Sequence, residues 1–172
     1  MNNMSFFEKL STLMSSPSTF FENLDESIYQ TLFFYFSISA IGIVFGALTR
    51  TVFYAGNEAT LFTTQEALRL VVLLVGIPII HFIISFLGAV GLKRTYQAYT
   101  YGAVPLFVIG WIPYAEIIAI FYSIIVTIKG IEKRHNFSNR RAIGAYLLPY
   151  GVGLFFYITV IIVWGLAIRF TV

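Results

Sequence analysis

The chain has 172 residues, of which 58% are hydrophobic, 18% are aromatic and only 11% are charged. About a quarter of the residues of a water-soluble domain are usually charged, because its surface must face water. The composition therefore excludes an ordinary soluble domain, and a sequence without cysteine excludes disulfides, thiol catalysis and thiolate metal ligands. The formal net charge is only +3, so the placement of the charges is more informative than their sum.

The first 27 residues are predicted to form an amphipathic segment at the membrane surface. Ser5 and Glu8 have the spacing of a capping box, and apolar residues recur at helical spacing after them. Pro17 separates this piece from Phe20 and Phe21. A short amphipathic helix beside membrane spans typically lies in the headgroup layer with its apolar face turned inward. The alternative is that these helices pack on cytosolic loops.

Two long apolar runs follow, at residues 28–49 and 70–92. Each run exceeds the roughly 20 residues that a helix needs to cross the hydrocarbon core, so we predict the first two spans here. Gly42 and Gly46 form a GxxxG pattern on the first span, which allows two helix backbones to approach closely. Thr63 and Glu66 have capping-box spacing and predict the start of the second helix.

Residues 98–128 form a third apolar stretch, with Glu116 as its one charged residue. Gly110 and Pro113 near its middle are typical of a tight turn between two short helices. We predict helices over residues 96–110 and 113–129 that form a short hairpin. This hairpin either crosses the membrane twice or is a re-entrant pair buried against its neighbours, because each half is short for a span.

A basic loop precedes the last apolar run, residues 142–168, which predicts a fifth span. In this arrangement one side of the membrane holds eight cationic residues and the other side holds three. They are Lys9, Lys93, Arg94, Lys129, Lys133, Arg134, Arg140 and Arg141 on the first side, and Arg50, Arg69 and Arg169 on the second. The excess predicts that the N-terminus and the basic loops are cytoplasmic and that the C-terminus lies outside.

These elements predict an all-α fold, a polytopic membrane helical bundle with one domain. Residues 1–27 are the amphipathic interfacial segment, and residues 28–172 are a transmembrane domain with about five spans, of which spans 3 and 4 form the short hairpin.

Glu116 and His81 are the candidate polar groups within the membrane. An ionised carboxylate in a bilayer costs several kcal/mol, so it usually faces a cavity or a partner. Glu116 lies three residues after Pro113, so the alternative is the first turn of a helix at the outer interface, where the helix dipole favours its charge. His81 is expected near the centre of the second span. It either hydrogen-bonds a neighbouring helix or forms a proton relay with Glu116.

Three prolines, Pro78, Pro105 and Pro149, lie inside apolar runs. Proline removes a backbone donor and bends or breaks a helix. Such positions are either kinks that help helices to pack or the broken helices of a transporter's binding site.

The cationic residues near the spans are candidates for binding lipids or a protein partner. Each Lys or Arg close to an anionic membrane surface contributes about 1 kcal/mol of attraction. The candidates are Lys93, Arg94, Lys129, Lys133, Arg134, Arg140 and Arg141. The alternative is that they only orient the chain in the membrane.

Several short motifs carry a family resemblance. They are "TYGAVPLFVIGWIP", which contains Tyr101, Gly102 and Pro105, the basic "GIEKRHNFSNRRA", and "YLLP" at 146–149. Upstream, "FFEKLSTLMSSPSTFFENL" is similar to the family's region before the first span. The chain thus resembles the Yip family of Ypt/Rab-interacting membrane proteins in its short prokaryotic form.

The resemblance implies five spans, a cytoplasmic N-terminus and a non-enzymatic membrane component, linked in eukaryotic relatives to small-GTPase recruitment and vesicle traffic. The family's eukaryotic Asp-Leu-x-Gly-Pro signature is missing, and so is a long cytosolic N-terminal domain. The fold is therefore expected to carry over without the GTPase partner.

The sequence contains no serine-nucleophile motif, paired acids, phosphate-binding loop or histidine-rich cluster, so we predict no enzyme, no cofactor and no metal. We expect a membrane scaffold or adaptor with a basic cytoplasmic face. The alternative is a small transporter or channel that uses Glu116, His81 and the proline-kinked helices. Expected partners are the bilayer with its anionic lipids, an unidentified membrane or cytosolic protein and a second copy of the chain, but not nucleic acid. The expected location is the cytoplasmic membrane, or an internal membrane in a eukaryotic source.

Overall fold

The computed structural model describes residues 4–54, 56–112 and 114–171, and the side chains of these residues except 162, 163 and 165–171. The described residues form seven helices and no strand. They are α1 (Phe6–Ser15), α2 (Pro17–Glu22), α3 (Ile28–Phe53), α4 (Glu58–Ser85), α5 (Leu92–Val108), α6 (Glu116–His135) and α7 (Asn139–Thr171). The predicted all-helical fold is confirmed.

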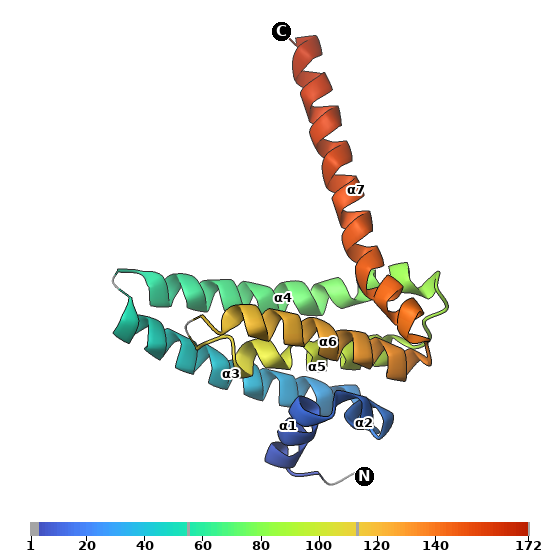
Figure 1. The fold of residues 1–172 in the computed structure, drawn as a ribbon. Helices are drawn as coiled ribbons and strands as arrows, with labels where there is room; N and C mark the ends of the chain where they lie inside the picture. The colour runs from blue at the N-terminus through green and yellow to red at the C-terminus, as the bar shows by residue number, and fades with distance from the viewer. Residues whose placement is uncertain (1–3, 55, 113, 172) are drawn as a thin grey trace.

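The helices α3 to α6 lie side by side as a bundle, with α1 and α2 against one long side of it, next to α3, and α7 pointing away from it (Figure 1). Three helices of the described chain are long and apolar enough to cross a membrane: α3, α4 and the part of α7 from Asn139 to Ile161. Helix α5 has only 17 residues. By length and composition, the described chain thus has three candidate membrane spans.

Helix starts follow local capping where the side chains supply it. Ser5 caps α1 and Ser27 caps α3, and each serine forms a reciprocal capping box with the residue three positions later. The predicted box at Thr63 and Glu66 is wrong, because α4 already begins at Glu58 and both residues lie inside it. The hydroxyl of Thr63 donates to the carbonyl of Ala59 instead. The capping-box spacing of Thr63 and Glu66 therefore does not mark the start of a helix.

The helix bounds differ from the predicted ones where glycine ends a helix early. Helix α4 ends at Ser85 rather than at residue 92, and Gly88 and Gly91 adopt left-handed φ values of 85° and 82° in the connection that follows. Helices α5 and α6 lie close to their predicted ranges. The turn between them contains Tyr114 at a φ of 66°, and Pro113 lies outside the described residues.

None of the three prolines that lie inside apolar runs ends a helix. Pro78, Pro105 and Pro149 lie inside the continuous helices α4, α5 and α7. The alternative of broken helices is therefore wrong for these three positions.

Glycines set the closest contacts between helices. A Cβ atom placed on Gly102 of α5 would lie 2.8 Å from Cβ and 2.9 Å from Cα of Thr127 on α6. Gly42 of α3 is equally close to Phe107 of α5, where an added Cβ would lie 2.8 Å from the Cβ of Phe107. Gly46, the second residue of the GxxxG pattern, faces the ring of Phe62 on α4. Both glycines of that pattern thus pack within the chain.

The N-terminal segment, residues 4–27, packs on the bundle through its aromatic residues. Phe20 and Phe21 of α2 are buried, and the ring of Phe20 meets Tyr101 of α5 edge to face at a centroid distance of 4.9 Å. Phe7 of α1 is exposed. The buried pair packs on a helix of the bundle and not on a loop, and the membrane placement of residues 1–27 stays a prediction.

Substituting Gly102→Ala should destabilise the bundle, because the new methyl group overlaps Thr127 and forces α5 and α6 apart. Overpacking of this kind costs about 1–3 kcal/mol, more than alanine gains in helix propensity. The matched control is Gly144→Ala, since an added Cβ on Gly144 meets nothing within 4 Å. Thermal unfolding of the purified protein in detergent measures the difference. Equal melting temperatures for the two variants would contradict the close contact.

Candidate functional site

One end of the bundle, here called the basic end, gathers the predicted cationic residues. The start of α3, the end of α4, the start of α5, the end of α6 and the start of α7 meet there (Figure 1). All seven cationic candidates lie on these ends. They are Lys93 and Arg94 on α5, Lys129, Lys133 and Arg134 on α6, and Arg140 and Arg141 on α7. The structure brings together residues up to 48 positions apart in the sequence (93 to 141).

Arg134 connects three segments of the chain. Its Nη1 donates to the carbonyl of Leu24 at 2.8 Å, and its Nη2 donates to Oε1 of Gln97 at 2.6 Å. Gln97 is fully buried and donates in turn to the carbonyl of Glu26 at 3.1 Å. Burial lowers the pKa of Arg134 from its ordinary value, but a guanidinium stays charged at neutral pH. Arg134 therefore holds the N-terminal segment to α5 and α6.

Ion pairs strengthen the same attachment. Lys133 Nζ lies 2.6 Å from Glu22 of α2, and Lys9 of α1 lies 2.5 Å from Glu26. The hydroxyl of Tyr101 donates to the other carboxylate oxygen of Glu26 at 2.5 Å. The hydrogen bond to Glu22 raises the pKa of Lys133. Of these cations, Lys133 is one that the sequence assigned to lipid or partner binding, whereas Lys9 pairs with Glu26 inside the N-terminal segment.

Lys129 pairs with Glu132 on the same helix, at 2.8 Å. The other four candidates are exposed. Lys93, Arg94, Arg140 and Arg141 are exposed, and none of them forms an ion pair within the described ranges. Arg141 donates to the carbonyl of Leu87, which links α7 to the connection between α4 and α5. We call these four residues the outer cations.

Apolar side chains surround the outer cations. Phe86 is 76% exposed and Val90 is 66% exposed in the connection between α4 and α5. The guanidinium of Arg141 also lies 4.6 Å from the ring centroid of Phe137. Cations next to exposed apolar groups are typical of a surface that sits at the boundary between headgroups and acyl chains.

His81 is not at the centre of a span but four residues before the end of α4, because α4 ends at Ser85. Its Nδ1 lies 2.7 Å from Oγ1 of Thr95 on α5, and the same hydroxyl lies 3.2 Å from Nε2 of His135 on α6. His81 thus belongs to a hydrogen-bonded group that joins three helices at the basic end.

The protonation of this group follows from its contacts. His135 is buried at the end of α6, and the backbone N–H of Val90 donates to its Nδ1. Because Nδ1 accepts this bond, the ring is neutral, and its Nε2 carries the proton and donates to Thr95. The hydroxyl proton of Thr95 is then directed at His81.

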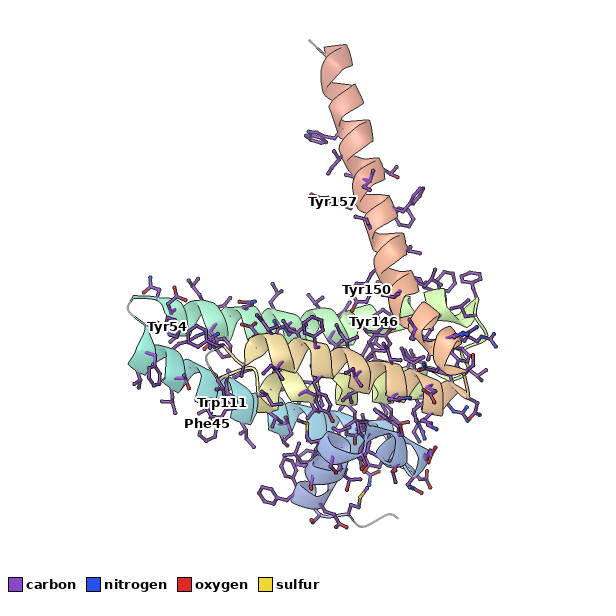
Figure 2. All side chains as sticks on the ribbon, in the orientation of Figure 1. Phe45, Tyr54, Trp111, Tyr146, Tyr150 and Tyr157 are labelled. Atoms are coloured by element: carbon purple, nitrogen blue, oxygen red, sulfur yellow. The ribbon has the colours of Figure 1, made fainter. Side chains whose placement is uncertain are left out.

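Glu116 lies at the opposite end of the bundle. It is the first residue of α6 and is exposed. His135 is the last residue of the same helix, so the two are separated by about 28 Å along it at 1.5 Å per residue. The structure does not bring Glu116 and His81 together, and the hypothesis of a relay between them is wrong. Trp111 and Tyr54 lie at this end as well (Figure 2).

An ion pair in the middle of the bundle was missed by the sequence analysis. Glu66 and Arg69, one turn apart on α4, are joined at 2.9 Å, and Glu66 is only 5% exposed. Both lie within two turns of the midpoint of this 28-residue helix. The sequence analysis placed Glu66 and Arg69 just before the second span, because it expected the helix to start near Thr63. The helical pattern continuing back to Glu58 was the signal that could have found them.

Within the described residues, no group of three or more His, Asp or Glu side chains could hold a metal ion. The polar groups with defined geometry are the basic end and the Glu66–Arg69 pair.

The chain matches a known family model. The family model described as "Yip1 domain" matches residues 11–164, which include all of α2 to α6 and most of α7. Neither a curated protein nor a solved structure matches the chain.

Replacing Arg134 by methionine should release the N-terminal segment. The variant leaves the carbonyl of Leu24 and the amide of Gln97 without their charged donor, and hydrogen bonds to charged groups contribute about 1.5–3 kcal/mol each. Arg140→Met is the matched control, because Arg140 is exposed and outside these contacts. Hydrogen exchange of residues 4–24 reports the release. Unchanged protection in Arg134→Met would show that the other contacts hold the segment without Arg134.

Proposed function

The chain belongs to the Yip1-domain family, and from this premise we propose that it is a non-enzymatic membrane scaffold whose basic end binds anionic lipid headgroups. The observation that carries the proposal is the division of the seven cationic candidates. Lys129, Lys133 and Arg134 contact carboxylate or carbonyl groups of the chain. The four outer cations are exposed and form no ion pair among the described residues, and Arg141 is the one of them that donates to the chain, at the carbonyl of Leu87.

The chemistry of the outer cations supports a lipid surface as their partner. Their apolar neighbours Phe86 and Val90 would enter the acyl boundary while the cations reach phosphate oxygens. Each cation near an anionic surface adds about 1 kcal/mol. The N-terminal segment, attached to the same end, would lie in the headgroup layer with Phe7 turned to lipid.

We further propose five crossings, with α5 and α6 as a short hairpin that spans the membrane between α4 and α7. The N-terminus and the basic end would then be cytoplasmic and the C-terminus outside. The expected location is the cytoplasmic membrane, or an internal membrane in a eukaryotic source. A protein partner at the basic end and a homo-oligomer stay predictions.

A small transporter or channel is the second candidate. The transporter hypothesis drawn from the sequence relied on Glu116 and His81, but these residues lie at opposite ends of the bundle. The observation in favour of transport is instead the Glu66–Arg69 pair, since ionised side chains within spanning helices usually mark a functional site.

The orientation can be tested by cysteine labelling, because the natural sequence contains no cysteine. Single cysteines at Asn139 and at Asn57 lie at the two ends of the bundle. An impermeant maleimide should label Asn139→Cys only after the membrane is opened and Asn57→Cys in intact cells. The opposite pattern would reverse the proposed topology.

Lipid binding can be tested with two double variants that remove the same charge. Arg94→Gln with Arg140→Gln should weaken association with anionic lipid by roughly thirtyfold, the product of two contributions of about 1 kcal/mol. Lys129→Gln with Lys133→Gln should leave it nearly unchanged, because these lysines already pair with Glu132 and Glu22. Electron spin resonance of spin-labelled phosphatidylserine in nanodiscs measures the association. Equal losses in both variants would refute a specific role for the outer cations.

A further inference from the structure

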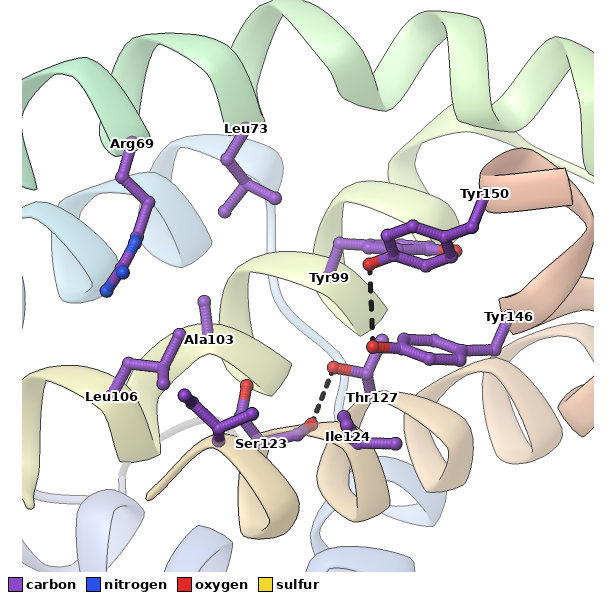
Figure 3. A pocket seen from close by; sticks show the side chains of 11 residues that line it. Arg69, Leu73, Tyr99, Ala103, Leu106, Ser123, Ile124, Thr127, Tyr146 and Tyr150 are labelled. Atoms are coloured by element: carbon purple, nitrogen blue, oxygen red, sulfur yellow. Dashed lines mark hydrogen bonds between the residues drawn. The ribbon is translucent and has the colours of Figure 1, made fainter. Parts of the chain in front are cut away.

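A cavity of about 200 Å³ lies between α4, α5, α6 and α7, in the middle of the chain's helices (Figure 3). Arg69 and Leu73 reach into it from α4, Tyr99 from α5, Ser123 from α6, and Tyr146 and Tyr150 from α7. None of the outer cations lines it. Arg69 lies on one side of the cavity, tyrosine hydroxyls lie on the other side, and apolar side chains line the wall between them. This arrangement suits a ligand with a charged end and an apolar body.

Arg69 supplies the charge in the cavity. Glu66 contacts only Nη1 of Arg69, at 2.9 Å and 3.1 Å from its two oxygens. A guanidinium has five N–H donors in a planar fork. The Nε and Nη2 donors are therefore available for a second acceptor that enters from the cavity.

Hydroxyl groups line the side of the cavity away from Arg69. The hydroxyl of Tyr150 donates to that of Tyr146 at 3.4 Å, so the Tyr146 proton is left to point elsewhere. Tyr99 is 5% exposed, and its hydroxyl is buried with no hydrogen-bond partner among the described residues. A buried hydroxyl without a partner is costly, which favours an occupant or ordered water nearby.

The walls between these two polar regions are apolar. Leu73, Ala103 and Ile124 come from three different helices. The cavity opens past Ile120 and Tyr150, which are 42% and 59% exposed. A second, apolar cleft of about 460 Å³ adjoins the base of α7, lined by Gly76 and Ile80 of α4 and by Pro149 and Gly153 of α7. The cavity and this cleft are both bordered by α4 and α7 and share no lining residue.

We propose that the cavity binds an aliphatic monocarboxylate, with its carboxylate on Arg69 and its hydrocarbon body against Leu73, Ala103 and Ile124. Because Glu66 already balances the charge of Arg69, a bound carboxylate leaves the site with one net negative charge, which the Nε and Nη2 donors share. A phosphate dianion would leave two negative charges in a mostly apolar site, which is more unfavourable. The volume equals that of about six or seven water molecules, which suits a carboxylate with a short chain.

Two sources share this chemistry, a free short-chain acid and a fatty acid from the membrane. Titrating acetate, hexanoate and hexadecanoate against the protein in zwitterionic nanodiscs separates them, with saturation-transfer NMR as the readout and empty nanodiscs as the blank. Affinity should rise about fourfold per methylene group that is buried, as hydrophobic transfer predicts. Affinity that stops rising at hexanoate identifies a short-chain ligand, and a continued rise identifies a fatty acid.

Three variants test the site itself. Arg69→Lys removes the planar fork and should weaken hexanoate binding about ten- to a hundredfold, the range for a charged hydrogen bond. Ala103→Leu should weaken it by filling the cavity without touching the ion pair. Glu66→Gln should tighten it, because the competing carboxylate is removed. Tightening is a result that a merely structural ion pair would not produce.

Arg50→Lys is the matched control, since Arg50 stacks on the ring of Phe62 at 3.9 Å and does not line the cavity. Binding of hexanoate should be unchanged in this variant. If Arg69→Lys does not fold, Ala103→Leu and Glu66→Gln decide the question. Equal affinity of hexanoate and hexanamide, or wild-type affinity in both Ala103→Leu and Glu66→Gln, would overturn the proposal. Neither result bears on the lipid surface at the basic end.

Discussion

The close approach of α5 and α6 is the constraint on which the rest of the structure depends. Gly102 of α5 lets the backbone of α6 come close at Thr127, and Gly130 of α6 does the same at Ala98, where an added Cβ would lie 2.9 Å from its Cα. The ring of Phe21 contacts α6 at Gly130 as well. In a bilayer, helices gain little from burying apolar surface, so contact between small residues is a main source of their association. This packing puts Arg134 within reach of α5 and of the N-terminal segment.

Cations at the basic end serve two different purposes. A cation that lies between helices needs hydrogen-bond acceptors, and Arg134 finds them in backbone carbonyls and in Gln97. A cation at the edge of the bundle remains accessible to headgroups, as Arg94 and Arg140 do. The same residue type thus stabilises the fold on α6 and forms a surface on α5 and α7. Mutating the whole basic stretch at once would mix the two effects.

Two polar groups inside the bundle are bonded within the chain, the Glu66–Arg69 ion pair and the His135 ring. Glu66 and Arg69 neutralise one another on α4, and the neutral His135 completes its hydrogen bonds with Val90 and Thr95. The neutral group fits a structural connection between three helices. The ion pair differs, because Arg69 keeps donors directed toward a cavity, and this difference motivates the carboxylate site.

Family membership, the all-helical class and the approximate helix positions followed from the sequence alone. They depend on local properties: long apolar runs, capping residues such as Ser5 and Ser27, and turn residues such as Gly110. The gathering of Lys93 and Arg140 at one end could also be anticipated, because an antiparallel order of helices brings alternate connections together.

Tertiary structure alone decided which residues form a site. Thr63 and Glu66 read locally as a cap, yet the helix runs through them, and only the packing of α4 shows a buried ion pair beside a cavity. His81 appeared central because the end of α4 depends on Gly88 and Gly91, whose left-handed backbone the apolar pattern does not reveal. In the sequence, Arg134 and Arg140 are two arginines of the same basic stretch, and nothing there distinguishes their roles. Their roles differ because one faces the carbonyls of residues more than 100 positions away and the other faces outward, and periodicity carries no information about such distant neighbours.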